Sequence, residues 1–236
     1  MRPFDVLLIV CFCILILICS GSAAMHYRSE AFLDHKMRFV DEKGDEIDIS
    51  KTETDEQEIA TMFIDPDSVV LELGARYGTV SCAINKQLRN PRNQVSVEPD
   101  KTVWDALEKN RIANECQFST LRGFISNKQL ALVNGGKDGY AMTGVIGESD
   151  VPSFSLDSIE QATGLKFDTL VADCEGCLES FFEENPHMYQ QLKMITFEHD
   201  MPSKCNYNAV KSGLLKAGFV KIHDRHDFHT VWKKGG

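Results

Sequence analysis

Apolar and polar positions along the chain alternate between two periodicities from about residue 59 to the C-terminus. Short apolar runs such as Val69–Leu73 predict buried strands, and stretches such as Thr79–Leu88, with apolar residues every three or four positions, predict helices. The last sixteen residues of this pattern, 219–234, predict two strands around a tight turn. The strand-like runs are 69–73, 93–99, 118–126, 167–176 and 193–200, and the helical stretches are 79–88, 100–116, 155–164, 177–192 (interrupted near Pro186) and 206–218.

Strands that alternate with helices indicate a single α/β domain. Such a pattern predicts right-handed crossovers and a mostly parallel sheet with helices on both faces, a three-layer Rossmann-like arrangement. A closing antiparallel hairpin is unusual for dinucleotide-binding domains and typical of the class I methyltransferase sheet. We therefore expect that sheet over residues 59–236.

The N-terminal segment differs from the rest. Val6–Cys19 is an unbroken apolar block of 14 residues, and Ser22-Ala23-Ala24 resembles a signal cleavage site. No charge occurs from Val6 to Tyr27, so a retained single-pass anchor is the alternative. We expect residues 1–25 to be a signal or membrane anchor, which predicts a membrane location, or the secretory pathway and secretion after cleavage. The acidic residues 26–58 are expected to form a solvated lead-in or stalk.

Composition excludes some partners and leaves the redox compartment open. The net charge of −10 and the absence of a Lys/Arg stripe predict no nucleic-acid partner. The segment 127–152 is rich in glycine and predicts an irregular, mobile loop. Three of the eight cysteines lie in the apolar block; the other five are Cys82, Cys116, Cys174, Cys177 and Cys205, so a monomer keeps at least one of them unpaired.

The turn after the first strand bears on the cofactor. A dinucleotide site requires the spacing G-x-G-x-x-G, whereas this turn reads Gly74-Ala75-Arg76-Tyr77-Gly78. Glu98 ends the next strand at a spacing that suits a ribose diol. S-adenosylmethionine has that ribose, a positive sulfonium and no phosphate. This makes it a better match than NAD to a looser turn with surplus carboxylates.

Several motifs in order resemble one family. The segments "LELGARYGTVS", "VSVEPD", "LEKNRIANE", "SFSLDSI", "FDTLVADCEGCLESF" and "MITFEHD" are similar to those of the FkbM-like S-adenosylmethionine-dependent methyltransferases, over about Val69 to Trp232. The family's Glu-Pro and Asp-x-Glu-Gly elements are present as Glu98-Pro99 and Asp173–Gly176. Arg76 stands where the family usually has Asn, so the turn either differs or directs Arg76 outward.

The resemblance implies roles for individual residues. It places Glu72 and the turn Gly74, Ala75, Tyr77 and Gly78 around the methionine end of the cofactor. It places Glu98, with Pro99, at the ribose hydroxyls, and Gly123 and Phe124 near the adenine. It requires no metal, and none is expected.

Three side chains are candidates for the chemistry. Asp173 or Glu175 is expected to orient or deprotonate a substrate hydroxyl, or alternatively to cap the helix that follows. His199 is a candidate general base. Asp173, Glu198 and Asp200 form an alternative Mg²⁺ set.

Two further motifs have less chemical meaning. Cys174-Glu175-Gly176-Cys177 spells C-x-x-C, but lies outside the context of a redox site, so Cys174 is expected to be a packed thiol. His223, His226 and His229 are expected on a solvated rim, because a hairpin turn scatters their directions.

These observations together predict an S-adenosylmethionine-dependent methyltransferase. We expect O-methylation of a hydroxyl on a glycan, lipid or small metabolite, with the loop 127–152 over the acceptor. The alternative is a catalytically inactive binding module on the same fold.

Overall fold

The computed structural model describes residues 37–134 and 142–235. Arg38–Gly236 forms one compact unit. The predicted signal or anchor at residues 1–25 lies outside the described residues. Among the residues that are described, no helix is long and apolar enough to cross a membrane.

A seven-stranded sheet forms the centre, in the order β12-β13-β11-β10-β3-β4-β5. The five strands from β11 to β5 run parallel, and β13 pairs antiparallel with both β11 and β12. This order and these directions are those of the class I methyltransferase fold, so the predicted fold class is confirmed. The strands are β3 (Val70–Leu73), β4 (Gln94–Glu98), β5 (Ser119–Arg122), β10 (Thr169–Ala172), β11 (Met194–Glu198), β12 (Phe219–Arg225) and β13 (His229–Lys234).

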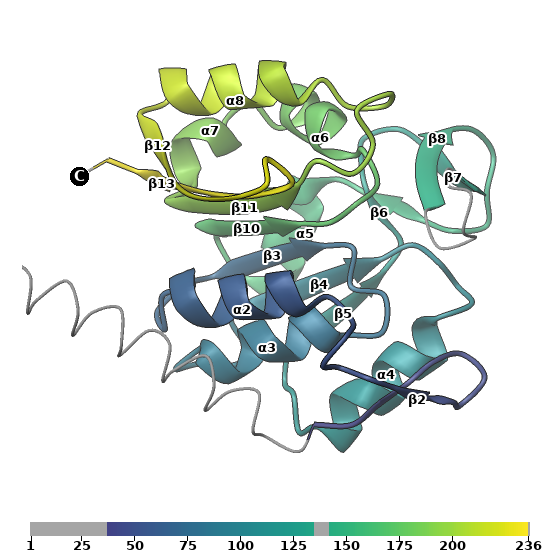
Figure 1. The fold of residues 1–236 in the computed structure, drawn as a ribbon. Coiled ribbons are helices and arrows are strands. Elements are labelled where there is room, and N and C mark those ends of the chain that lie inside the picture. Colours follow the sequence, from purple (N-terminus) through teal and green to yellow (C-terminus); the bar gives the residue numbers. More distant parts are fainter. Residues whose placement is uncertain (1–36, 135–141, 236) are drawn as a thin grey trace, which may run out of the picture. The chain divides into compact units, whose positions relative to one another are not determined.

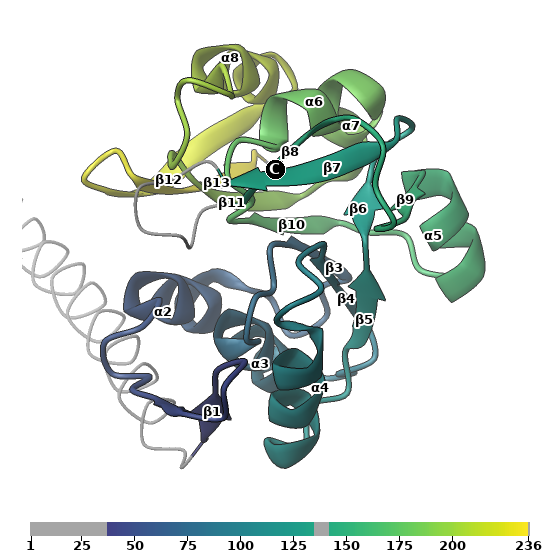
Figure 2. The same cartoon turned by 90° about the vertical axis from the view of Figure 1, so that its right-hand side faces the viewer.

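Helices cover both faces of the sheet (Figures 1 and 2). One face packs against α5 (Leu156–Thr163), α6 (Leu178–Glu184), α7 (Met188–Gln191) and α8 (Tyr207–Lys216), and it holds the largest apolar cluster. The other lies under α2 (Thr54–Phe63), α3 (Thr79–Gln87) and α4 (Trp104–Ala113). Strand alternation divides neighbours between these faces: Leu71 and Leu73 join the apolar cluster, whereas Glu72 points to the α2 side.

Two predicted segments differ in detail. The run 118–126 divides at Gly123 into β5 and β6 (Phe124–Ile125), and β6 leaves the main sheet to pair with β9 (Ser153–Phe154). The segment 127–152, predicted as irregular, contains an antiparallel pair, β7 (Leu130–Asn134) and β8 (Met142–Ile146). Its glycines concealed the strand pattern.

The expectation of a solvated lead-in up to residue 58 is wrong. β1 (Phe39–Val40) and β2 (Glu46–Ile47) form a small hairpin, and the Phe39 side chain is fully buried. Asn110 of α4 clamps this hairpin, because its side chain accepts from Val40 N and donates to Val40 O. α2 then begins at Thr54, within the supposed stalk. The acidic composition reflects carboxylates that face inward as well as solvent.

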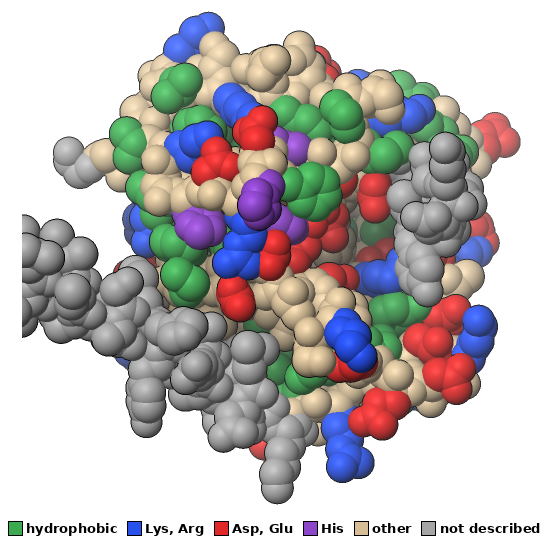
Figure 3. Space-filling view, viewed as in Figure 1, with side chains coloured by type: hydrophobic (Ala, Val, Ile, Leu, Met, Phe, Trp, Pro, Cys, Tyr) green, Lys and Arg blue, Asp and Glu red, His purple; other side chains and the backbone are tan. Residues whose placement is uncertain are grey.

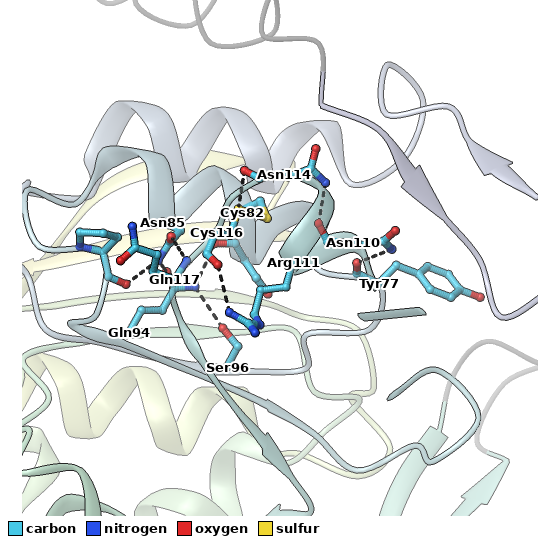
Figure 4. The surroundings of a disulfide bond; sticks show 12 residues. Tyr77, Cys82, Asn85, Gln94, Ser96, Asn110, Arg111, Asn114, Cys116 and Gln117 are labelled. Carbon is cyan, nitrogen blue, oxygen red and sulfur yellow. Dashed lines mark hydrogen bonds between the residues drawn. A yellow bond between two sulfur atoms is a disulfide. The ribbon is translucent and has the colours of Figure 1, made fainter. Parts of the chain in front are cut away.

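The described residues contain two disulfides. Cys82 of α3 is bonded to Cys116, which precedes β5 (Figure 4). Asn85 supports the same connection by accepting from Gln117 N, at 2.8 Å. Cys174 is bonded to Cys177 across three positions, so the packed-thiol expectation for Cys174 is wrong. Cys205 is the free cysteine of the described residues and is buried.

Candidate active site

A cleft of about 310 Å³ opens at the carboxyl ends of the parallel strands. This is where doubly wound sheets bind ligands, and the volume is at the lower end of the range for small-molecule sites. Residues from several parts of the chain line it: the ends of β3, β4 and β10, the segment 123–130, part of the β7–β8 hairpin, α6, and single residues before α4 and α8. Side chains and backbone at the cleft include Gly74, Arg76, Glu98, Pro99, Val103, Gly123, Phe124, Ser126, Lys128, Ile146, Asp173, Glu175, Phe181, Glu184 and Lys204.

The turn after β3 depends on glycine at its first position. Gly74 has φ of +92°, and a Cβ there would lie 1.7 Å from the carbonyl oxygen of Asp173. The turn and the end of β10 therefore approach each other too closely for any side chain. Gly78, with φ of +84°, is the N-cap of α3. Sequence reasoning assigned these glycines to cofactor contact, and the structure adds the backbone approach that requires Gly74.

Arg76 adopts a left-handed backbone, which asparagine would favour more than arginine does, with φ of +42°. Its amide donates a 2.6 Å hydrogen bond to Glu98 Oε2, and the Asp100 amide donates a 2.7 Å bond to Glu98 Oε1. The Glu98 carboxylate thus fixes the turn from the neighbouring strand. Burial nevertheless raises the pKa of Glu98 to about 7, against a usual value of 4.5.

The structure places the predicted cofactor residues in two groups. Gly74, Glu98, Pro99, Gly123 and Phe124 line the cleft. Glu72, Ala75, Tyr77 and Gly78 do not. Ala75 is buried behind the turn, and Tyr77 points away, where its hydroxyl donates to Glu42 Oε2 at 2.5 Å. Glu72 faces a separate cavity under α2.

Asp173 and Glu175 follow β10 on the floor of the cleft. Glu175 has φ of +53° and Gly176 +90°, and the Cys174–Cys177 disulfide spans this tight turn. The Glu175 amide donates to Asp200 Oδ2 at 2.7 Å. Burial and the nearby charge of Glu53 raise the pKa of Asp173 well above its usual range, and burial with the Asp200 charge raises that of Glu175. Raised pKa values suit carboxylates that accept protons near neutral pH.

The structure does not bring His199 into the cleft. Glu198 is on the α2 side of β11, and the next residue points to the opposite side. There the His199 ring stacks on Tyr207 at 4.9 Å and lies 3.4 Å from Lys211 Nζ through its Nδ1 atom. Burial and Lys211 lower its pKa. A role as base toward a ligand in the cleft is therefore not supported by its position.

The three histidines of the C-terminal hairpin, His223, His226 and His229, differ in their burial. His229 is buried, with its Nε2 atom 3.3 Å from Glu198 Oε1, so the solvated-rim expectation is wrong for this residue. The register of β13 pairs His229 with Glu198 directly across the sheet. Pairing of that kind cannot be read from the spacing of histidines along the chain.

Several cleft residues were missed by sequence reasoning. Ser126 donates to Glu184 on α6, and the Asn127 amide donates to the same carboxylate. Lys128 Nζ lies 3.6 Å from Glu184 Oε1. No motif indicated them, because β6 brings them to the cleft only after it departs from the main sheet.

Comparisons with known proteins add context. No family model and no curated protein matches this chain. Similar solved structures include a proposed RNA methyltransferase from Pyrococcus horikoshii (12% identity, 89% of this chain and 97% of that one, TM-score 0.48). A precorrin-6y C5,15-methyltransferase from Geobacter metallireducens is similar at 13% identity, over 78% of this chain and 90% of that one, with a TM-score of 0.48. A proposed tRNA methyltransferase from Streptococcus pneumoniae, in complex with S-adenosyl-L-methionine, is similar at 10% identity, over 77% and 72%, with a TM-score of 0.47.

Identities and TM-scores this low carry over neither activity nor substrate, and the strand order itself establishes the fold. The similar structures do correct one expectation. The acidic net charge predicted no nucleic-acid partner, whereas two of these structures are described as RNA methyltransferases. That exclusion does not stand. Net charge describes the whole chain and not one surface, and the lining of the cleft includes Arg76, Lys128 and Lys204 as well as carboxylates.

Proposed function

We propose that this chain is an S-adenosylmethionine-dependent methyltransferase of the FkbM-like kind, acting on a hydroxyl group. The observation that carries the proposal is the joining of the Gly74 turn, Glu98 and Asp173 around one cleft at the carboxyl ends of a class I methyltransferase sheet.

The residues present fit this cofactor. Gly74 lets the turn lie against the end of β10 at the cleft, and Glu98 presents a carboxylate beside the cleft. Both Glu98 oxygens accept one backbone amide each, and a carboxylate oxygen retains a second lone pair for a hydroxyl. Phe124 and Val103 supply apolar surface for the adenine ring of the cofactor. When bound, the cofactor supplies an electrophilic methyl group on a sulfonium.

The chain's own residues would align the acceptor and manage one proton. Asp173 and Glu175 lie together at the end of β10, and each has a raised pKa. Either can accept the hydroxyl proton as the oxygen gains its methyl group. The β7–β8 hairpin contributes Leu130 and Ile146 to the rim, where they would exclude water.

The side chains of the cleft define the class of acceptor only broadly. A carboxylate base suits a hydroxyl, and the lysines at the rim admit an anionic acceptor. The acceptor panel should therefore contain RNA as well as glycans, lipids and small metabolites.

The two disulfides bear on where in the cell the protein folds. Disulfides persist mainly in oxidising compartments, and the described residues contain two. We propose that the chain enters the secretory pathway through its apolar N-terminal segment, retained or cleaved.

The test is calorimetric titration of the full-length chain, in mild detergent, with S-adenosylhomocysteine. We expect micromolar binding that weakens at least tenfold in Glu98→Ala and is unchanged in Asp105→Ala, an exposed carboxylate on α4. Transfer of labelled methyl to the acceptor panel follows, with Asp173→Asn expected to lose turnover while it keeps cofactor binding. A folded wild-type chain that binds no cofactor overturns the proposal and favours a non-catalytic binding module.

A further inference from the structure

Beneath α2 lies a second cavity, of about 20 Å³, against the α2 side of the sheet. It shares Gly74 and Asp173 with the cleft and is otherwise separate. A cavity of this size holds one water-sized occupant. The titratable residues that line it are Glu53, Glu56, Glu72, Asp173, Glu198 and His229.

The lining carries a large excess of negative charge. Five of its residues are carboxylic acids, and none is a lysine or arginine. Arg225 of β12 forms ion pairs with Asp55 and Glu58 of α2, outside this lining. Carboxylates gathered out of water repel one another strongly unless protons or a cation neutralise them. Figure 3 shows acidic and histidine side chains gathered on the face where α2 meets the C-terminal hairpin.

Three of these side chains have the geometry of a ligand set. Atoms of Glu56, Glu198 and His229 all lie within 4.8 Å of one another. The Glu198 Oε1 to His229 Nε2 distance is 3.3 Å. Two ligand atoms that each lie about 2.1 Å from one ion, at right angles, are about 3 Å apart. Small side-chain adjustments would therefore place both atoms on a shared ion.

A further observation in the same cavity is a buried oxygen without a hydrogen-bond partner. Glu72 is 1% exposed, and its Oε1 atom has no hydrogen-bond partner. Buried carboxylate oxygens are almost always satisfied. A cation in this cavity would lie among carboxylates and would offset their mutual repulsion.

The neighbouring acidic cluster of Asp173, Glu175 and Asp200 lacks this feature. Asp200 already accepts hydrogen bonds from the amides of Glu175 and Met201 and from the Tyr207 hydroxyl. Its charge is therefore satisfied by the fold.

We propose that the cavity under α2 binds one divalent cation of the first transition row through Glu56, Glu198 and His229, with the Glu72 carboxylate in the lining of the same cavity. One imidazole with carboxylates, and no thiolate, suits Mn²⁺ or Fe²⁺ rather than a soft ion. The ion joins α2 to β11 and β13 and so holds α2 over the end of the sheet. This site does not depend on the proposed methyl transfer.

Mn²⁺ is the probe, because free and bound Mn²⁺ differ in their electron paramagnetic resonance spectra. The full-length chain is stripped with EDTA and titrated at pH 7.5. We expect one Mn²⁺ per chain and a rise in Tm of roughly 5–10 °C at a hundredfold excess over Kd. Glu198→Gln and His229→Gln should each weaken binding at least tenfold, whereas Glu148→Gln, at an exposed position on the other side of the cleft, should not change it.

The variants keep the test decisive. Glu198→Gln keeps the shape of the side chain and replaces a buried carboxyl group by a neutral amide, so its metal-free form should fold about as well as the wild type, which circular dichroism checks. If it does not fold, Glu56→Gln replaces it, since that side chain is 15% exposed. A folded wild type that binds no Mn²⁺ at millimolar concentration overturns the proposal and indicates carboxylates neutralised by protons. Binding that is lost in Asp200→Asn but kept in Glu198→Gln also overturns it, since the ion would then lie in the other cluster.

Discussion

The two faces of the central sheet differ in the kind of side chain that they bury. On the side of α5–α8, strand residues such as Leu71, Leu170 and Ile195 join one apolar cluster. On the α2–α3 side, the strands contribute Glu72, Ser96 and Thr196, which the registers of β3, β4, β10 and β11 set in one row with Val171. The first face resembles an ordinary protein core. The second holds polar groups that need specific partners, and it lies beneath the turn that shapes the cleft.

The apolar face stabilises the folded state, whereas the polar face costs part of that free energy. Apolar burial on the α5–α8 side stabilises the sheet without directional requirements. On the α2–α3 side, buried carboxylates are costly unless they are protonated or bound to a cation. Such sites are commonly functional. Apolar burial on the α5–α8 side therefore offsets the free-energy cost of the carboxylates on the α2–α3 side.

Adjacent residues on β11 give the largest contrast. Ile195 is fully buried on the apolar face, and Thr196 is nearly buried on the polar face. We expect Ile195→Ala to lower the free energy of unfolding by about 2–5 kcal/mol, because it leaves a cavity. Thr196→Val keeps the volume and removes a hydroxyl, so it should lower this free energy by about 0.5–1.5 kcal/mol, at most the contribution of one hydrogen bond. Urea denaturation with a constant m-value measures both, and equal losses would contradict the comparison.

The disulfide Cys82–Cys116 anchors the polar side, since it ties α3 to the segment before β5. Replacing both cysteines by serine should lower the free energy of unfolding by about 3–4 kcal/mol, because the unfolded chain regains the freedom of a closed loop. Reversible denaturant titration of the double variant and of wild type gives the difference. The single variant Cys205→Ser, at the free cysteine, is the control for loss of a buried sulfur. A double variant as stable as wild type would show that packing alone holds α3.

The acidity of the polar face predicts a pH dependence. Burial raises the pKa of Glu72 from 4.5 to about 7, so the folded state binds this proton more tightly than the unfolded state. The resulting stabilisation is complete below about pH 4.5 and is lost as pH rises through 7, at about 3 kcal/mol in total. In EDTA, stability measured by denaturation should therefore decline from pH 5 to pH 8. Glu72→Gln should flatten that decline, and Glu148→Gln should not; an unchanged slope in Glu72→Gln would refute the assignment.

Helix capping gives the smallest contrast. On the apolar side, Ser155 accepts from the Ser158 amide to cap α5, and Asn206 accepts from the Ala209 amide to cap α8. On the polar side, α2 and α3 begin after Glu53 and Gly78, which have left-handed backbones and no capping side-chain bond. Ser155→Ala should therefore lower the free energy of unfolding by about 1 kcal/mol. Thermal denaturation measures the effect, and the exposed Ser203→Ala serves as a control.

The sequence predicted the site residues that lie at the ends of strands. Gly74 and Asp173 directly follow a strand, Glu98 is the last residue of one, and all three line the cleft. His199 was misplaced because one step along β11 reverses the side of the sheet. Glu53 and Glu56 were missed because an acidic, weakly apolar segment gave no sign that α2 turns those carboxylates inward.

The sequence by itself determined the alternation of strands and helices, the closing hairpin and the glycine turn, because these depend on local periodicity and backbone freedom. Only the tertiary structure decided which carboxylates share a cavity, which cysteines pair and which histidine is buried. These outcomes depend on strand register and on contacts between residues far apart in the chain. The pairing of Glu198 with His229 across β11 and β13, under a helix from the other end of the domain, is one such contact.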